Sequence, residues 1–250
     1  MLFMIVLVHE LGHGLAASYY KWPIYRLMIL PFGGELETDA FGHRPWKEEV
    51  YVVLAGPFQH VLLFFIAFIL NQFNLFTGQY YDLFQQMNMM ILVVNLLPAL
   101  PLDGGKLVFL MLARMQPFIL AHAWTIKISL IFTFIFMGLI ICFAPWHMNS
   151  WMLASFLLFS IWKDRKQHRF YFLRFLLNKG EGTKIKQLTL SGEVSVMAAL
   201  EHFLKNKQHE VIVKENGKTI GMITESQLLH TCFALKQPFV KLKELAHPQP

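Results

Sequence analysis

The chain has 250 residues, of which 55% are hydrophobic and only 15% are charged, and its mean hydropathy is +0.44. This composition is typical of a membrane protein and argues against an ordinary soluble domain. The net charge of +6 does not indicate a nucleic-acid face, because the basic residues lie between apolar segments instead of forming one cluster. The only two cysteines, Cys142 and Cys232, lie far apart, which excludes a disulfide framework and a Cys-rich metal site.

The first apolar segment, Met1 to Tyr20, carries the motif His9-Glu10-Leu11-Gly12-His13. Histidines at i and i+4 lie on one face of a helix and can hold one metal ion, while Glu10 can act beside that ion without being a ligand. This is the H-E-x-x-H zinc-protease pattern, and zinc accepts such ligands at a site with one position left open. Ionisable side chains are costly in hydrocarbon and usually mark function, so we predict a metal site here instead of two core histidines.

Other apolar segments predict further membrane helices. They are residues 50–70, 84–100, 107–112 as a partial span, 128–145 and 150–162. Because Lys and Arg gather in the other connections and after residue 162, the positive-inside rule predicts that residues 21–49, 106–127 and the tail are cytoplasmic, with 71–83 and 146–149 on the opposite side. This orientation places Met1 outside the cytoplasm, so we expect that an upstream span is missing from this sequence.

The stretch 96–105 ends in Asp103-Gly104-Gly105 after prolines at 98 and 101. Two prolines three residues apart break a helix and free backbone carbonyls, which lipid tolerates only where protein or water covers them. Asp103 is then a carboxylate at membrane depth, and a metal held by two histidines would be a suitable partner. A turn at the membrane surface explains the same residues equally well.

Together these motifs, in this order, resemble the site-2 protease family of intramembrane zinc metalloproteases, and its sporulation branch in particular. The similarity covers nearly the whole chain and includes Pro31-Phe32-Gly33-Gly34, Ala55-Gly56-Pro57-Phe58-Gln59-His60 and the run from Asn95 to Gly105. It implies His9, His13 and Asp103 as zinc ligands, Glu10 as the catalytic base, and Asn95 as a residue that orients the substrate backbone. It also implies a membrane-associated, inactive sigma-factor precursor as the substrate, inhibitory membrane proteins as partners, and the mother-cell membrane around the forespore as the location.

The segment between the first two spans is expected to bind substrate. Residues 26–30 and 35–38 predict two short strands flanking a turn at Gly33-Gly34. A protease must cleave an extended chain, and an exposed strand edge can hold one by β-augmentation. With the family resemblance this favours a substrate-binding role for Gly33 and Gly34 over a solvated hairpin without a partner.

Two features of the second span are predicted to serve packing. His60, a lone histidine on an apolar face, is expected to be hydrogen-bonded to a neighbouring helix and not bound to metal. Gly56-Pro57 is expected to mark a close helix crossing or a kink.

Residues 178–250 have the composition of a small soluble domain. The patterns predict a helix over 194–204, a strand over 210–213, a hairpin turn over 215–218, a returning strand over 219–224 and a helix from Glu225. This order resembles one CBS motif, a module that usually pairs with a second copy and can bind adenine nucleotide. The chain carries one copy, so pairing would take another chain, as in a homo-oligomer. A lone copy is expected to leave open the apolar strand faces that a second copy normally covers, such as those carrying Val211, Val213, Ile220 and Ile223. Gln227 stands where an acidic ribose contact is expected, which leaves nucleotide binding open against a docking role.

We therefore predict an α-helical polytopic membrane protein with a metalloprotease domain, 1–177, and a cytoplasmic α+β CBS-like domain, 178–250. Its predicted activity is that of a zinc endopeptidase that hydrolyses a peptide bond of a membrane-associated substrate. Two alternatives remain. A proteolytically inactive binding or regulatory protein of the same fold would have no reason to keep Glu10. A metal-ion transporter would need polar residues across both leaflets, whereas here they gather toward one side.

Overall fold

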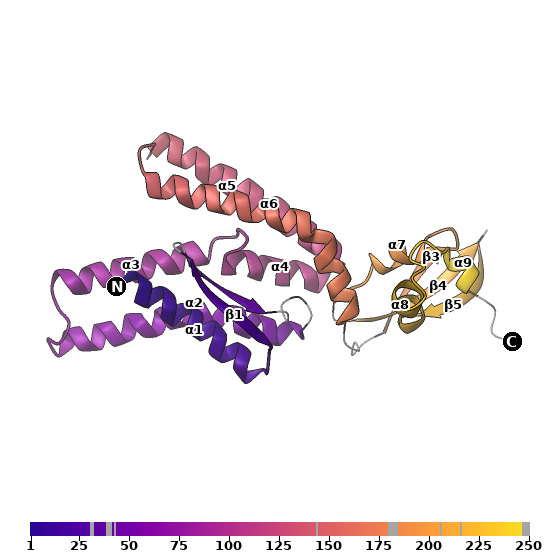
Figure 1. The fold of residues 1–250 in the computed structure, drawn as a ribbon, viewed down its shortest axis with the longest axis horizontal. Coiled ribbons are helices and arrows are strands. Elements are labelled where there is room, and N and C mark those ends of the chain that lie inside the picture. Colours follow the sequence, from indigo (N-terminus) through magenta and orange to yellow (C-terminus); the bar gives the residue numbers. More distant parts are fainter. Residues whose placement is uncertain are drawn as a thin grey trace. The chain divides into compact units, whose positions relative to one another are not determined.

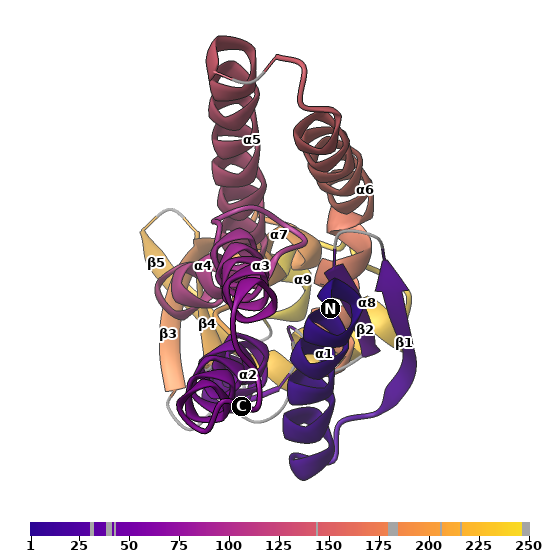
Figure 2. The same cartoon turned by 90° about the vertical axis from the view of Figure 1, so that its left-hand side faces the viewer.

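The computed structural model describes residues 1–30, 33–38, 42, 44–143, 145–179, 185–205, 207–215 and 217–246. The chain forms two compact units: Met1–Leu110 with Trp124–Lys166, and Met111–Ala123 with Gln167–Pro250. We call them the first and the second unit, and Figures 1 and 2 together label their helices and strands. The domain boundary expected between residues 177 and 178 stays a prediction.

The helices are α1 (Leu2–Tyr19), α2 (Trp46–Gln72), α3 (Gln79–Asn95), α4 (Asp103–Met115), α5 (Phe118–Phe143) and α6 (Met148–Leu177). Of the described residues, α1, α2 and α5 are the helices long and apolar enough to cross a membrane. The predicted break before Asp103 is confirmed, because α3 ends at Asn95 and the prolines at 98 and 101 lie in the connection to α4. The fragment predicted at 107–112 is part of the 13-residue helix α4, and the short span predicted at 150–162 is part of the 30-residue helix α6.

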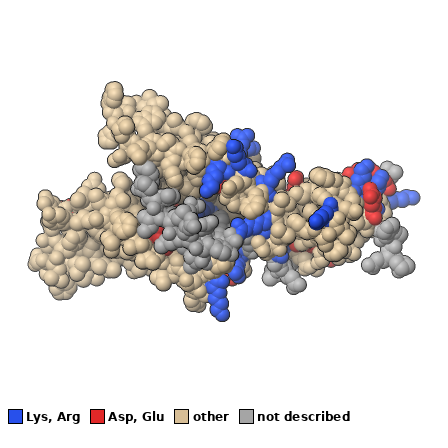
Figure 3. Space-filling model, in the orientation of Figure 1, with Lys and Arg blue, Asp and Glu red and all other residues tan. Residues whose placement is uncertain are grey.

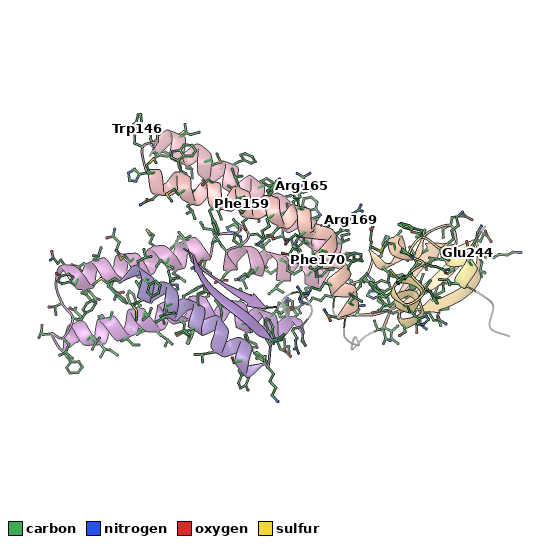
Figure 4. The ribbon with its side chains drawn as sticks, in the orientation of Figure 1. Trp146, Phe159, Arg165, Arg169, Phe170 and Glu244 are labelled. Carbon is green, nitrogen blue, oxygen red and sulfur yellow. The ribbon has the colours of Figure 1, made fainter. Side chains whose placement is uncertain are left out.

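The first unit exposes many large apolar side chains. Phe65 on α2 is 56% exposed, Phe134 on α5 is 61% exposed, and Trp146 in the α5–α6 connection is 91% exposed and lies at the tip of that connection (Figure 4). In Figure 3 the part of the surface occupied by α2 and α3 in Figure 1 is almost free of charged side chains. Exposed apolar surface of this extent is typical of contact with lipid.

A two-stranded antiparallel sheet follows α1. It consists of β1 (Ile24–Leu30) and β2 (Gly33–Thr38), and it lies beside α1 in Figures 1 and 2. The two predicted strands are confirmed, but the turn predicted at Gly33-Gly34 is wrong. These glycines begin β2, where Gly33 pairs with Leu30 and Gly34 with Ile29, and Pro31-Phe32 lie outside the described residues.

The second unit contains a three-stranded sheet in the order β3-β4-β5, made of β3 (Ile185–Ser191), β4 (Gln208–Glu215) and β5 (Lys218–Thr224). β3 and β4 are parallel, and β4 and β5 form the predicted antiparallel hairpin, whose turn residue Asn216 lies outside the described residues. The remaining helices are α7 (Val196–Leu200), α8 (Glu225–Phe233) and α9 (Leu242–Leu245).

One sequence-based expectation about this unit is wrong, and one of its strands was missed. The helix predicted over 194–204 is only the five-residue α7, because the chain turns after it so that the Leu204 N–H donates to His209 Nε2 over 3.2 Å. Strand β3 was not predicted. At the start of α8, Gln227 forms a capping box: the Thr224 N–H donates to Gln227 Oε1 over 2.9 Å, and the Gln227 N–H donates back to Thr224 Oγ1.

The apolar face of the hairpin is also opposite to the predicted one. Val211 and Val213 are fully buried and Ile223 is 1% exposed, so these side chains form the core of the unit and need no second module to cover them. The other face of the same strands carries Ile212, which pairs with Met222, and Met222 is 54% exposed.

Candidate metal centre

Four side chains predicted to form the site come together in the first unit. His9, Glu10 and His13 lie on α1, and Asp103 is the first residue of α4. The His9 and His13 Nε2 atoms are 3.1 Å apart and lie 3.1 and 3.0 Å, respectively, from Asp103 Oδ2. All four residues are between 3% and 5% exposed. Three potential ligand atoms therefore converge on one buried point.

The spacing of these atoms fits zinc. Ligands about 2.0–2.1 Å from a tetrahedral zinc ion lie roughly 3.3 Å from one another, close to the separations of 3.0–3.1 Å found here. Two imidazole nitrogens and one carboxylate oxygen are a donor set that zinc accepts, and three protein ligands leave the fourth position for a reactant. The residues present therefore fit the metal.

Hydrogen bonds orient two of the three candidate ligands. His13 Nδ1 donates to the Val52 carbonyl oxygen over 2.8 Å, which leaves the lone pair of Nε2 directed at the other two ligand atoms. Lys106 Nζ lies 3.2 Å from Asp103 Oδ1, so Oδ2 is the oxygen that faces the histidines. Neither partner was predicted. The i,i+3 spacing of Asp103 and Lys106 on α4 is a sequence signal that could have indicated Lys106. The Val52 carbonyl belongs to the backbone and leaves no such signal.

The site depends on a close approach of α2 to α1 at Gly56. A Cβ atom at Gly56 would lie 2.2 Å from His13 Nε2 and 2.7 Å from His9 Cε1. Gly12, on α1, is equally crowded, since its Cβ would lie 2.6 Å from the Ala55 carbonyl oxygen. The close helix crossing predicted at Gly56-Pro57 is thus confirmed, and it packs the histidines directly against the α2 backbone.

Glu10 lies beside the three converging atoms and outside their tight group. Its Oε1 is 3.9 Å from His9 Nε2, compared with 3.1 Å for the Asp103 oxygen. A carboxylate at this distance can exchange a proton with a reactant in the fourth position without occupying that position itself.

The predicted substrate-binding residues lie in neighbouring elements. Asn95 is the last residue of α3 and is 8% exposed, and within the described part of the chain it makes no polar contact with the four side chains above. Gly33 and Gly34 lie at the start of β2, in the hairpin beside α1. Their roles stay predictions.

His60 is held by a neighbouring helix, as predicted. Its Nδ1 donates to Asn88 Oδ1 on α3 over 2.7 Å, and Asn88 Nδ2 donates to the His60 carbonyl oxygen over 2.9 Å. The same ring nevertheless lies close to the metal centre, with its centroid 4.9 Å from that of the His9 ring.

Comparison with known proteins gives a consistent result. The family model for "Peptidase family M50" matches residues 1–79. Stage IV sporulation protein FB of Bacillus subtilis is 36% identical over 252 residues, an alignment that covers 99% of this chain and 88% of that protein. A zinc metalloprotease of Methanocaldococcus jannaschii is 26% identical over 231 residues, covering 89% of this chain and 65% of that protein. The structure of a site-2 protease from the same archaeon has a similar fold, with a TM-score of 0.54 at 24% identity over 65% of this chain and 74% of that chain.

Proposed function

The chain belongs to peptidase family M50, the site-2 proteases, and is a zinc metalloendopeptidase of the membrane; we propose that it processes an inactive pro-sigma factor during sporulation. The observation that carries the proposal is the similarity to a sporulation protein along 99% of the chain. The convergence of His9, His13 and Asp103 at 3.0–3.1 Å supplies the chemistry that such a protease needs.

Each residue of the centre has a separate role in this proposal. His9, His13 and Asp103 would hold the zinc ion, which as a Lewis acid would polarise a peptide carbonyl and acidify water. Glu10 accepts the proton of the attacking water and returns it to the leaving amine. Lys106 keeps Asp103 Oδ2 turned toward the histidines by binding Oδ1, and the Val52 carbonyl does the same for His13.

Substrate binding is assigned to the residues next to this centre. A peptide bond inside a helix is shielded by its neighbours, so the substrate must be extended at the scissile bond. The β1–β2 hairpin beside α1 can add such a segment as a further strand, and Gly33 and Gly34 at the start of β2 lack side chains that would obstruct it. Asn95 would then hydrogen-bond to the substrate backbone.

The proposal also covers the C-terminal domain, the partners and the location in the cell. Residues 178–250 are proposed to face the cytoplasm as a CBS-like domain that docks substrate, pairs with a second copy or binds adenine nucleotide. Inhibitory membrane proteins would restrain the protease in the mother-cell membrane around the forespore. Glu10 favours this function over that of an inactive relative, because a residue that is not a ligand has no use in a protein that only binds.

Reconstitution tests the proposal. The purified protein in lipid vesicles should cleave a membrane-associated pro-sigma factor at one position, cease to do so after a chelator removes zinc, and recover when zinc is returned. Cleavage that persists in the zinc-free protein, or its absence from the zinc-loaded protein with this substrate, would overturn it.

A further inference from the structure

The two histidines of the metal centre differ in what holds their second ring nitrogen. His13 Nδ1 donates to the Val52 carbonyl oxygen. His9 Nδ1 is buried and, within the described part of the chain, has no hydrogen-bond partner. A histidine that binds a metal almost always donates its other ring N–H to an acceptor, which fixes the ring and makes it a stronger ligand. His9 therefore lacks a partner that its role requires.

An acceptor without a donor lies beside it. His60 is 1% exposed, its ring centroid is 4.9 Å from that of His9, and the rings are tilted by 43°. Its Nε2 is buried and, like His9 Nδ1, has no partner among the described residues. Two buried nitrogens without partners thus belong to two rings in contact, although an unpaired buried polar group is costly.

The hydrogen atoms on these rings can be assigned from their other contacts. Asn88 Nδ2 donates to the His60 carbonyl oxygen, which directs Asn88 Oδ1 to His60 Nδ1. His60 Nδ1 must then carry the hydrogen, and His60 Nε2 is an acceptor. His9 Nε2 faces Asp103 and His13, so a metal bound there leaves the hydrogen on His9 Nδ1, which is a donor.

We propose that His60 is a positioning residue of the zinc site, whose Nε2 accepts a hydrogen bond from His9 Nδ1–H when His9 binds the ion. The centroid separation of 4.9 Å is about two ring radii plus a hydrogen bond, which is the spacing that such a bond between the two rings requires. Asn88, 2% exposed, anchors His60 from α3. The inference rests on the proposed function, because it requires a metal at His9.

The zinc affinity of the purified full-length protein, measured by competition with a chelator, tests this role. His60→Leu removes the acceptor and should weaken zinc binding by about 10- to 100-fold. His60→Gln places an amide oxygen near the position of Nε2 and should recover part of that loss. His122→Leu is the matched control, because His122 is a buried histidine of the second unit whose Nδ1 pairs with His168, and it should leave the affinity unchanged.

A second variant and a second measurement separate positioning from folding. Asn88→Leu keeps His60 but releases its ring, so it should also weaken zinc binding, and it serves if His60→Leu does not fold. Thermal unfolding of the zinc-free variants reports structural damage alone.

Two results would overturn the inference: zinc affinity unchanged in both His60→Leu and Asn88→Leu, or a loss that His60→Gln does not relieve and that follows the unfolding temperature of the zinc-free protein. If the wild-type protein itself bound no zinc, the proposed function would fail together with the inference. If the wild-type protein binds zinc and the variants give either of the two results above, only the inference about His60 fails.

Discussion

Glu10 is the residue whose role can be separated most cleanly from metal binding. Glu10→Gln leaves His9, His13 and Asp103 in place, so zinc content should stay near that of the wild type. Cleavage should fall by about 10²–10⁴-fold, since an amide cannot accept the proton of the attacking water. Metal analysis and cleavage assays on the same preparation check both parts, and a near-normal rate would remove Glu10 from the mechanism.

Substitution of Asp103 is expected to affect zinc binding and cleavage together. Asp103→Asn retains the shape of the side chain but offers a neutral, weaker oxygen to the metal and loses the ion pair with Lys106. We expect lower zinc occupancy as well as lost cleavage. Full occupancy with unchanged activity would show that Asp103 only begins α4 and is not a metal ligand.

Gly56 tests how closely the α2 backbone must approach the histidines. Gly56→Ala places a Cβ where His13 Nε2 and His9 Cε1 lie within 2.2 and 2.7 Å, so the ligands must move. Overpacking of this kind costs about 1–3 kcal/mol, and here it should also lower zinc affinity and cleavage. Gly14→Ala on α1 is the control, because a Cβ at Gly14 meets no atom within 4 Å, and it should retain zinc. Equal zinc affinity in both variants would contradict the crowding.

His9 and His13 could be predicted from their helical spacing and Glu10 from its place in the same motif, whereas the family resemblance implied Asp103 as a ligand. The residues that orient them could not be predicted in the same way. Val52 acts through its backbone carbonyl, 39 positions from His13, and a backbone contact places no requirement on the side chain. His60 was predicted to pair with a helix, but its closeness to His9 arises only when α2 packs on α1.

At the scale of elements, periodicity identified which residues share a face but not which face is inside. Val211 and Val213 were correctly placed on one side of β4, yet that side is the core and was predicted to be open. The strand pattern has period 2 on either face, and the packing of other elements decides which is covered. Strand β3 was missed because its apolar side is short: only Leu188 and Leu190 are half-buried, and every other residue of the strand is exposed.

A buried polar network joins the end of α6 to the sheet of the second unit. Lys179 Nζ lies 2.5 Å from Glu225 Oε1, and the His209 N–H donates to Glu225 Oε2 over 2.8 Å. Burial opposes the charge of Glu225, but hydrogen bonds from His209 and Lys179 keep its pKa below the ordinary value. The network therefore retains an ionised carboxylate inside the unit.

Removing that carboxylate should destabilise the second unit. Glu225→Gln leaves Lys179, whose side chain is 1% exposed, without its counter-ion, and breaking a buried pair costs about 3–5 kcal/mol. Hydrogen exchange of β4 and β5 measures the loss. Glu193→Gln is the control, since Glu193 pairs with Lys241 and Lys243 on the surface and its loss should change little. Equal protection in the two variants would show that the buried pair is dispensable.

For the whole molecule, the open question is what the second unit contributes to proteolysis. The sheet face with Ile212 and the 54% exposed Met222 is open in a single chain, so we expect it to contact another copy or the soluble part of the substrate. Met222→Glu places a charge on this face without entering the core and should weaken that contact while the unit stays folded. Gel filtration of the wild-type protein and of Met222→Glu shows whether another copy is the partner.

Deleting residues 183–250 should leave the zinc site assembled, because His9, His13 and Asp103 all lie in the first unit. Cleavage of a full-length substrate should fall strongly, whereas a short peptide that spans the scissile bond should be cleaved almost as before, since it never used the tail for docking. Met222→Glu should reproduce this difference in milder form. This variant is needed because the deletion also exposes residues that the tail covers, such as Phe118, whose N–H donates to the Phe203 carbonyl oxygen. A proportional loss with both substrates would make the tail a stability element. Unchanged cleavage of both would show that the second unit acts in something other than substrate capture.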